Sequence, residues 1–188
     1  MGLTGGIAAG KSEALAAFGR LGAATLSSDA VVHDLLNSEP LRDRLVERWG
    51  AEIAPDGAID RARIGGIVFA DPDQLTWLEA QIHPLVGERM SAWLAALPPQ
   101  TEIAVVEVPL LFEVGRNEVF DTTVAVIAAE DVRRERADAR GHALVDEREA
   151  RQLSQEEKAE RAAHVVGNDG SVEDLERALS ALIERLRR

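Results

Sequence analysis

Short apolar segments alternate with longer amphipathic segments along this chain. The apolar segments lie at 1–4, 23–27, 103–108, 122–128 and 164–166, and each has the length of one β-strand. The segment at 103–108 is apolar almost throughout, as expected for a central strand that is covered on both faces. The pattern therefore predicts an α/β fold with a five-stranded parallel sheet and helices on both faces.

The amphipathic segments predict the helices between these strands. A cap at Asp71 opens one long helix, which Pro84 is expected to kink or split. Ser171 and Asp174 resemble a weakened capping box at the start of the last helix. Further helices are predicted at 11–21, 30–37, 130–140 and 146–163.

Two segments are predicted to elaborate a single domain spanning 1–188. The segment at about 35–97 has no convincing strand, which predicts a helical insertion between two strands. Such an insertion can cover the carboxyl edge of the sheet, where ligands bind, so we expect it to bind the acceptor substrate. The segment at about 130–162 is the most charged and is a candidate lid, although a solvated helix face is the better explanation for most of its charges.

The composition narrows the classes of function. A formal net charge of −12 disfavours DNA or RNA as a partner. The absence of cysteine excludes disulfides and thiolate zinc sites. No apolar run approaches the roughly 18 residues of a membrane span, and no signal-peptide pattern is found, so we expect a cytoplasmic protein with no membrane partner. The oligomeric state stays open.

The segment at 5–12, Gly-Gly-Ile-Ala-Ala-Gly-Lys-Ser, matches the G-x-x-x-x-G-K-S pattern of a phosphate-binding loop in full. Its glycines allow successive backbone N–H groups to point at an anion, and the following helix adds its positive end. Lys11 supplies a mobile charge for the β- and γ-phosphates, and the Ser12 hydroxyl is the expected Mg²⁺ ligand. The predicted nucleotide-binding residues are Gly6, Ile7, Ala8, Ala9, Gly10, Lys11 and Ser12.

The alternative is a glycine-rich turn that fits the pattern by chance. The context argues against this, because an apolar segment precedes the loop and an amphipathic helix follows it. The loop alone does not separate kinases from GTPases or motor ATPases. Guanine specificity usually requires N/T-K-x-D, and neither Lys11 nor Lys158 has an Asp two residues later. A GTPase is therefore disfavoured.

Further motifs follow the loop in an order that resembles the dephospho-coenzyme A kinase family. The resemblance spans nearly the whole chain and implies a P-loop kinase fold like that of nucleoside monophosphate kinases. It also implies transfer of the γ-phosphate of Mg²⁺-ATP to the ribose 3′-hydroxyl of dephospho-CoA, the last step of coenzyme A synthesis. The matching segments are 2–7, Leu-Ser-Ser-Asp at 26–29, Ile-His-Pro-Leu at 82–85, Val-Pro-Leu-Leu-Phe-Glu at 108–113, Arg136, Arg140, Arg151 with Gln155, Lys158 with Arg161, and Asn-Asp-Gly at 168–170.

Asp29 is the principal candidate beyond the loop. It follows the second predicted strand at the carboxyl edge of the sheet, where a carboxylate could orient an acceptor hydroxyl and take its proton. Capping of the helix predicted at 30–37 is an equally good explanation from the residues alone. The resemblance implies that Asp29 is the catalytic base, although Ser27 stands where the family has the first Asp of an Asp-x-Asp pair.

The arginines of the predicted lid are the next candidates. The resemblance implies that Arg140 neutralises charge on the transferring phosphoryl group. Arg136 lies one turn earlier on the same helix face and is expected to assist. Exposed pairing with neighbouring acids is the alternative for both, and Arg133 is predicted to be a surface residue.

Three further residues are weaker candidates. Glu107, where the family usually has Asp, could hold a Mg²⁺-bound water, but a satisfied carboxylate at a strand end is equally plausible. Glu113 and His83 are candidates for the acceptor pocket, and a structural histidine is the alternative for His83.

Two rival functions stay open at the level of sequence. One is a related small-molecule kinase that acts on a nucleoside or a nucleoside monophosphate. The other is a nucleotide-binding regulator without transferase activity. An assay of ADP release over these acceptors separates the three hypotheses.

Overall fold

A computed structural model describes residues 1–139 and 152–187. The chain divides into two compact units. The first consists of Met1–Ser27 with Pro98–Arg188 and contains all five strands, and the second is Ser28–Leu97. No described helix is long and apolar enough to cross a membrane.

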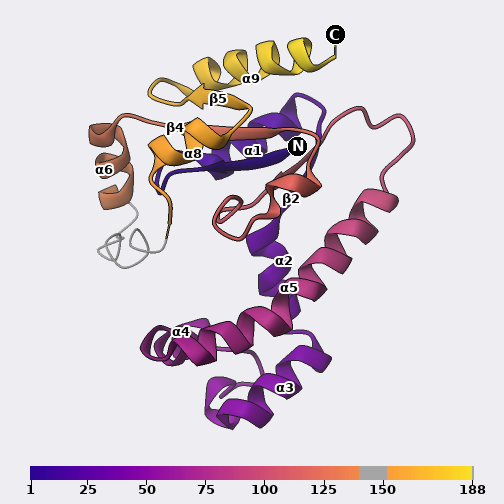
Figure 1. Cartoon of the computed structure of the whole chain (residues 1–188), viewed down its shortest axis with the longest axis vertical. Helices are drawn as coiled ribbons and strands as arrows, with labels where there is room; N and C mark the ends of the chain where they lie inside the picture. Colours follow the sequence, from indigo (N-terminus) through magenta and orange to yellow (C-terminus); the bar gives the residue numbers. More distant parts are fainter. Residues whose placement is uncertain (140–151, 188) are drawn as a thin grey trace. The chain divides into compact units, whose positions relative to one another are not determined.

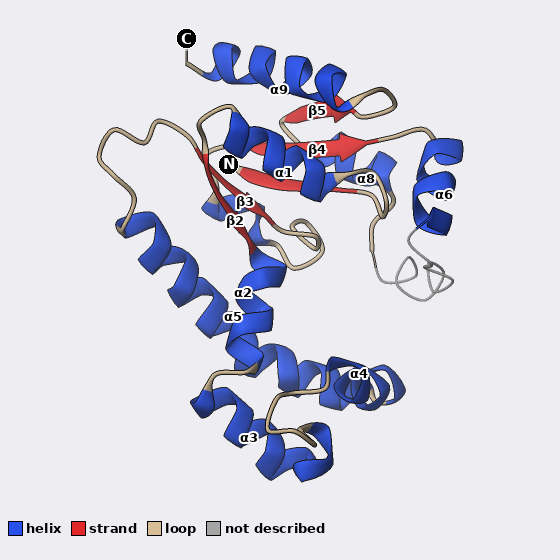
Figure 2. Cartoon of the chain, turned by 180° about the vertical axis from the view of Figure 1, so that it is seen from behind, coloured by secondary structure: helices blue, strands red, loops and turns tan. Residues whose placement is uncertain are grey.

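The first unit is built on one parallel sheet (Figures 1 and 2). Its strand order is β2-β3-β1-β4-β5, so the N-terminal strand lies at the centre. The predicted five-stranded parallel sheet is confirmed, and each strand begins and ends within one residue of its expected bounds. The strands are β1 (Gly2–Gly5), β2 (Ala24–Ser27), β3 (Ala104–Glu107), β4 (Thr123–Ile127) and β5 (His164–Gly167).

Helices cover both faces of this sheet, as the sequence predicts. On one face, α1 (Lys11–Arg20) packs against α9 (Val172–Leu186), and α8 (Gln155–Arg161) lies on the other face against β4 and β1 (Figure 2). The core between α1, α9 and the sheet is apolar and includes Leu3, Phe18, Val105, Val124 and Leu179. The other helices in the described part of this unit are the short η2 (Arg116–Val119) and α6 (Glu130–Ala139).

Two helix starts in the first unit test the sequence predictions. The capping box at α9 is present in both directions, because the Ser171 hydroxyl accepts from the Asp174 amide and the Asp174 carboxylate accepts from the Ser171 amide. The start of the helix predicted at 146–163 lies outside the described residues, but the expectation that this helix runs through 152–154 is wrong. Ser154 caps α8, so residues 152–154 precede the helix.

The second unit is entirely helical. Its core includes Leu41, Leu45, Ile64, Leu78 and Ile82, and Trp49 contacts Trp77 edge to face with ring centroids 5.3 Å apart. Its helices are α2 (Ser28–Leu36), α3 (Glu39–Trp49), η1 (Ala51–Ile53), α4 (Arg61–Ala70) and α5 (Pro72–Ala95).

Two predictions for this unit need correction. The helix expected to start at residue 30 begins at Ser28. The expectation that Pro84 splits the long helix is wrong, because α5 is a continuous helix of 24 residues with Pro84 inside it. The buried side chains of Ile82 and Val86 flank Pro84, so packing compensates for the hydrogen bond that a proline cannot donate.

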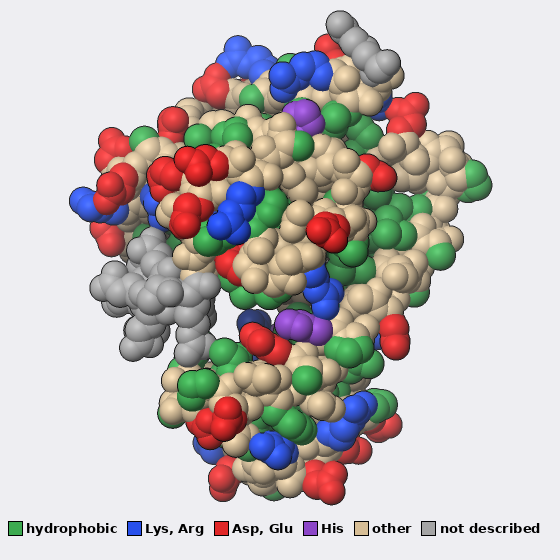
Figure 3. Space-filling view, in the orientation of Figure 1, with side chains coloured by type: hydrophobic (Ala, Val, Ile, Leu, Met, Phe, Trp, Pro, Cys, Tyr) green, Lys and Arg blue, Asp and Glu red, His purple; other side chains and the backbone are tan. Residues whose placement is uncertain are grey.

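The chain has 33 acidic side chains and 21 Lys and Arg side chains. On the face drawn in Figure 3, Asp and Glu side chains lie interspersed with basic side chains over the described residues, in keeping with the net charge of −12.

Candidate active site

The segment 5–12 joins the end of the central strand β1 to the start of α1. Gly5 allows β1 to approach β4 closely, since a Cβ there would lie 2.2 Å from the carbonyl oxygen of Val126. Gly10 is the N-cap of α1 and has the left-handed φ of 94° that favours glycine. Ala8 also has a positive φ, of 57°. The loop thus alternates backbone conformations, as an anion-binding nest of amides requires.

The Lys11 ammonium lies against the loop itself. Its Nζ donates to the carbonyl oxygens of Gly5 and Gly6, at 3.2 Å and 3.0 Å. Both acceptors are neutral, and a phosphate oxygen is a stronger acceptor for an ammonium donor. The Lys11 ammonium therefore lies beside the loop, in a position from which it can move to a nucleotide phosphate.

Ser12 and Glu107 bring two oxygen ligands together. The Ser12 hydroxyl donates to Oε1 of Glu107 at 3.4 Å. Glu107 is the last residue of β3, is buried, and lies opposite Leu3 of β1 and Ser27 of β2 in the sheet register. Hydroxyl and carboxylate oxygens suit Mg²⁺, which usually takes only one or two protein carboxylates together with water and phosphate. Within the described residues no cluster of three metal-binding side chains occurs, so these two oxygens fit such an ion only as partial ligands.

The arginines of α6 contact the loop and its neighbour. Arg133 donates from Nε to the Ile7 carbonyl oxygen at 2.8 Å, so the prediction that Arg133 is a surface residue is wrong. Arg136 donates to the carbonyl oxygen of Asn168 at 2.9 Å rather than to an acid on its own helix. The buried Asn168 side chain in turn donates to the Ala9 carbonyl oxygen at 2.9 Å. These contacts fasten α6 and the end of β5 to the phosphate-binding loop.

Glu113 forms an ion pair on the other face of the sheet. Its Oε1 lies 3.0 Å from Nζ of Lys158 and accepts from the backbone amide of Leu153 at 2.9 Å. The Lys158 side chain is 0% exposed. Burial lowers the pKa of its ammonium below the ordinary value, and the Glu113 carboxylate opposes that shift.

The other predicted residues lie in the second unit or outside the described residues. Asp29 is the second residue of α2 and is exposed, two residues along the chain from the end of β2. It therefore lies inside the helix rather than at the capping position. His83 is half-buried within α5. Arg140 lies outside the described residues.

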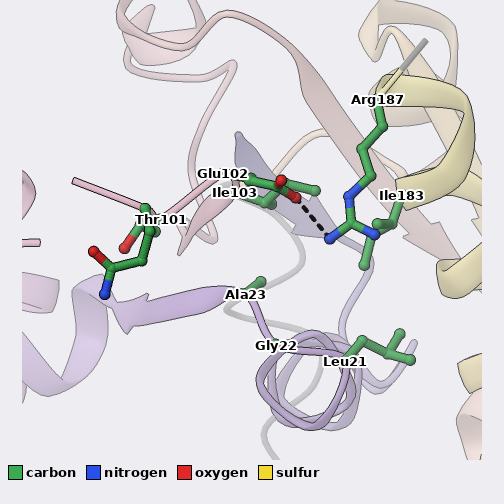
Figure 4. Close-up of a pocket in the computed structure, with 9 residues that line it drawn as sticks. Leu21, Gly22, Ala23, Thr101, Glu102, Ile103, Ile183 and Arg187 are labelled. Carbon is green, nitrogen blue, oxygen red and sulfur yellow. Dashed lines mark ion pairs between the residues drawn. The ribbon is translucent and has the colours of Figure 1, made fainter. Parts of the chain in front are cut away.

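A separate hollow of about 200 Å³ lies at the amino ends of β2 and β3, at the other end of these strands from the phosphate-binding loop (Figure 4). It is lined by the residues before β2 and β3 and by the end of α9, and Arg187 forms an ion pair with Glu102 there at 2.8 Å. Ligands of parallel sheets bind at the carboxyl ends of the strands, and this hollow lies at the amino ends. It is therefore not the candidate active site.

Sequence reasoning did not predict several of the contacts that the structure shows around the loop and on the other face of the sheet. Arg133 and Arg136 are three residues apart on α6, and this spacing on one helix face was the available signal. Lys158 is one of only two lysines in a chain that otherwise uses arginine, which was the available signal for a special position. Asn168 was explained by turn chemistry, and no local pattern shows that its side chain reaches Ala9.

Comparison with known proteins gives a consistent result over the whole chain. Residues 1–174 match the sequence profile of the family described as dephospho-CoA kinase. A dephospho-CoA kinase of Anaeromyxobacter dehalogenans is 41% identical over 100% of this chain and 92% of its own length.

Solved structures agree with this result. A Thermus thermophilus protein superposes with a TM-score of 0.82 and 35% identity, covering 98% of this chain and 96% of its own. The dephospho-CoA kinase of Campylobacter jejuni has a TM-score of 0.71 and 25% identity, covering 98% of this chain and 95% of its own.

Proposed function

Because the chain belongs to the dephospho-CoA kinase family, we propose that Asp29, Lys11 and Arg140 carry out its phosphoryl transfer. The family members transfer the γ-phosphate of ATP to dephospho-CoA in the final step of coenzyme A synthesis, and this chain is such an ATP-dependent phosphotransferase. The observation that carries the site assignment is the loop at 5–12, with the Lys11 ammonium and the Ser12 hydroxyl at one end of it.

The loop supplies the nucleotide site in this proposal. Backbone amides between Gly6 and Ser12 bind the phosphate oxygens, and the N-terminus of α1 adds its partial positive charge. Lys11 exchanges the two carbonyl oxygens that it now contacts for the β- and γ-phosphates. An ammonium binds a phosphate oxygen more strongly than a neutral carbonyl oxygen, so phosphate binding draws the ammonium away from these two carbonyl groups.

Ser12 and Glu107 would hold the Mg²⁺ ion. The Ser12 hydroxyl is the direct ligand in this assignment, and the longer Glu107 side chain acts through a bound water. When bound, the ion offsets negative charge on the phosphates. The hydrogen bond between the two residues keeps both oxygens together before the nucleotide arrives.

Asp29 is proposed as the base for the acceptor hydroxyl. The 3′-oxygen forms a bond to the γ-phosphorus, the bond from phosphorus to the β,γ-bridging oxygen breaks, and the hydroxyl proton passes to the Asp29 carboxylate. Support comes from the position of Asp29 in the chain, immediately after β2, and from its exposure, which leaves the carboxylate accessible. Arg140 is proposed to neutralise charge on the phosphoryl group as it is transferred.

The acceptor site is proposed to include His83, Glu113 and Arg136. The hydrogen bond from Arg136 to the Asn168 carbonyl oxygen and the ion pair of Glu113 with Lys158 hold these two side chains in fixed orientations. The insertion at about 35–97 and the segment at about 130–162 are proposed as acceptor-binding region and lid. Closure of a lid would exclude water and suppress hydrolysis of ATP.

An assay of ADP release with dephospho-CoA, nucleosides and nucleoside monophosphates tests the substrate. Asp29→Asn tests the base, and we expect kcat to fall by about 100-fold or more with ATP affinity retained. Asp34→Asn, at another exposed acid of α2, is the matched control and should leave kcat unchanged. Full turnover by Asp29→Asn contradicts the assignment of the base. Tight ATP binding with no acceptor-dependent turnover by the unaltered protein would identify a regulator instead.

A further inference from the structure

Lys158 is a fully buried charge at a junction of three chain segments. Its side chain is 0% exposed, and its Nζ donates to the Pro109 carbonyl oxygen at 2.7 Å and to the Gln152 side chain at 3.4 Å. The Glu113 carboxylate lies 3.0 Å from the same nitrogen. Lysine is among the residues least often found fully buried, and here it is buried only with several partners.

The partners of Lys158 belong to segments with different predicted tasks. The Pro109 carbonyl oxygen also accepts from the hydroxyl of Thr4, the residue before the phosphate-binding loop begins. Glu113 also accepts from the Leu153 amide, at the approach to α8. The ammonium therefore links the end of β1, the segment 109–113 after β3, and the segment 152–154.

Stability alone gives a poor account of this arrangement. Burying an ammonium and a carboxylate carries a desolvation cost that their attraction offsets only in part, and apolar residues of similar volume often serve as well. In addition, Oε2 of Glu113 is buried and has no hydrogen-bond partner among the described residues. The pair does what an apolar contact cannot, because its directional bonds fix three backbone segments at defined distances.

We propose that Lys158 is a positioning residue for the acceptor side of the reaction. Its ammonium holds segment 109–113 in a fixed place relative to the phosphate-binding loop, through Pro109 on one side and Glu113 on the other. This inference rests on the proposed function of Glu113 in the acceptor site. Lys158 touches neither the loop residues 5–12 nor the nucleotide in this proposal, so its removal acts on the acceptor more than on ATP.

The test compares Lys158→Met with the double variant Lys158→Met/Glu113→Gln. The single variant leaves the Glu113 charge buried without its counter-ion, so we expect both a lower Tm and a KM for dephospho-CoA raised by about tenfold or more, because displaced positioning groups cost that much. The double variant removes the stranded charge but does not restore the directional bonds. Its Tm should recover while the raised KM persists, and the Kd for ATP should stay near that of the unaltered protein in both.

Glu160→Gln is the matched control, since Glu160 is an exposed acid on the same helix. It should change neither Tm nor KM. Recovery of Tm and KM together in the double variant overturns the positioning role of Lys158 but leaves the proposed function intact. An ATP Kd that rises as much as the KM for dephospho-CoA has the same consequence. If the single variant does not fold, the double variant is compared with Glu113→Gln alone, because Glu113 is itself placed in the acceptor site. A KM for dephospho-CoA no higher in the double variant than in Glu113→Gln then overturns the proposal. An unaltered protein that does not turn over dephospho-CoA overturns the proposed function and this inference with it.

Discussion

Gly10 is the position at which one added methyl group should damage the phosphate-binding loop most. Its φ of 94° lies in the left-handed region, and a Cβ there would lie 2.1 Å from Nδ2 of Asn168. That nitrogen donates to the Ala9 carbonyl oxygen at 2.9 Å, inside a buried site. A Gly10→Ala substitution therefore strains the backbone and displaces the Asn168 amide.

Two contributions set the magnitude. A left-handed conformation costs an L-residue about 1–2 kcal/mol. Loss of the bond from Asn168 to Ala9 leaves a buried polar group unsatisfied, at about 1–3 kcal/mol. The sum is about 2–5 kcal/mol. For a chain of this size each kcal/mol lowers Tm by about 2–4 °C, so we expect a drop of about 10 °C for Gly10→Ala.

Gly22→Ala is the matched control. Gly22 has a similar φ of 89° but a Cβ there would meet nothing within 4 Å, so this variant carries the backbone strain alone. The Tm of both variants is measured by differential scanning calorimetry and ATP affinity by isothermal titration calorimetry. We expect the Tm of Gly22→Ala to fall by about 2–4 °C for each kcal/mol of strain, with unchanged ATP affinity. The Tm of Gly10→Ala should fall further, and its ATP affinity should also fall.

Combining Gly10→Ala with Asn168→Ala isolates the collision. Removing the Asn168 side chain also removes the atom that the new methyl group meets, so the two changes should cost less together than the sum of each alone. Equal losses for Gly10→Ala and Gly22→Ala, or strictly additive losses in the double variant, would refute the reasoning.

Two further predictions concern Glu107 and Asp174. Glu107→Gln should raise the Mg²⁺ concentration needed for half-maximal activity by about tenfold, a typical cost of losing an outer ligand, with Tm little changed; an unchanged Mg²⁺ requirement argues against a metal role. The Ser171 amide lowers the pKa of the Asp174 carboxyl below its ordinary 3.8. Because the folded-state pKa is depressed, its contribution to stability is present above pH 3.8 and is lost as pH falls through the folded value. The Tm deficit of Asp174→Asn should therefore shrink in acid, and a deficit that is independent of pH contradicts a charge-based cap.

The sheet could be predicted from the sequence because buried parallel strands are continuous apolar runs that need no distant information. The phosphate-binding loop was equally accessible, since its function depends on consecutive residues. Helix starts were less accurate. Ser28 and Asp29 are both good capping residues, and the pattern does not show that the helix already includes them. Pro84 was expected to kink or split α5, but the helix is continuous, because packing on either side of the proline outweighs the local cost.

The environment of the loop was the part that sequence reasoning could not reach. Arg133 meets Ile7 across 126 positions of the chain, and Asn168 meets Ala9 across 159. Periodicity assigns a residue to a helix face but does not say which distant backbone that face will meet. Asp29 differs from these residues, because the sequence did single it out. Its role as the base depends on the family resemblance, and a kinetic experiment tests it.

The central place of β1 in the sheet has a consequence for how the protein is made. Gly2 lies opposite Val106 on one side and Thr123 on the other, so β1 leaves the ribosome well before either strand that it pairs with. The helical unit Ser28–Leu97 is complete earlier and depends on contacts close in sequence, which form fast. Synthesis therefore favours an order in which the inserted helices fold first. The nucleotide-binding sheet forms afterwards, when β3 and β4 become available to pair with β1.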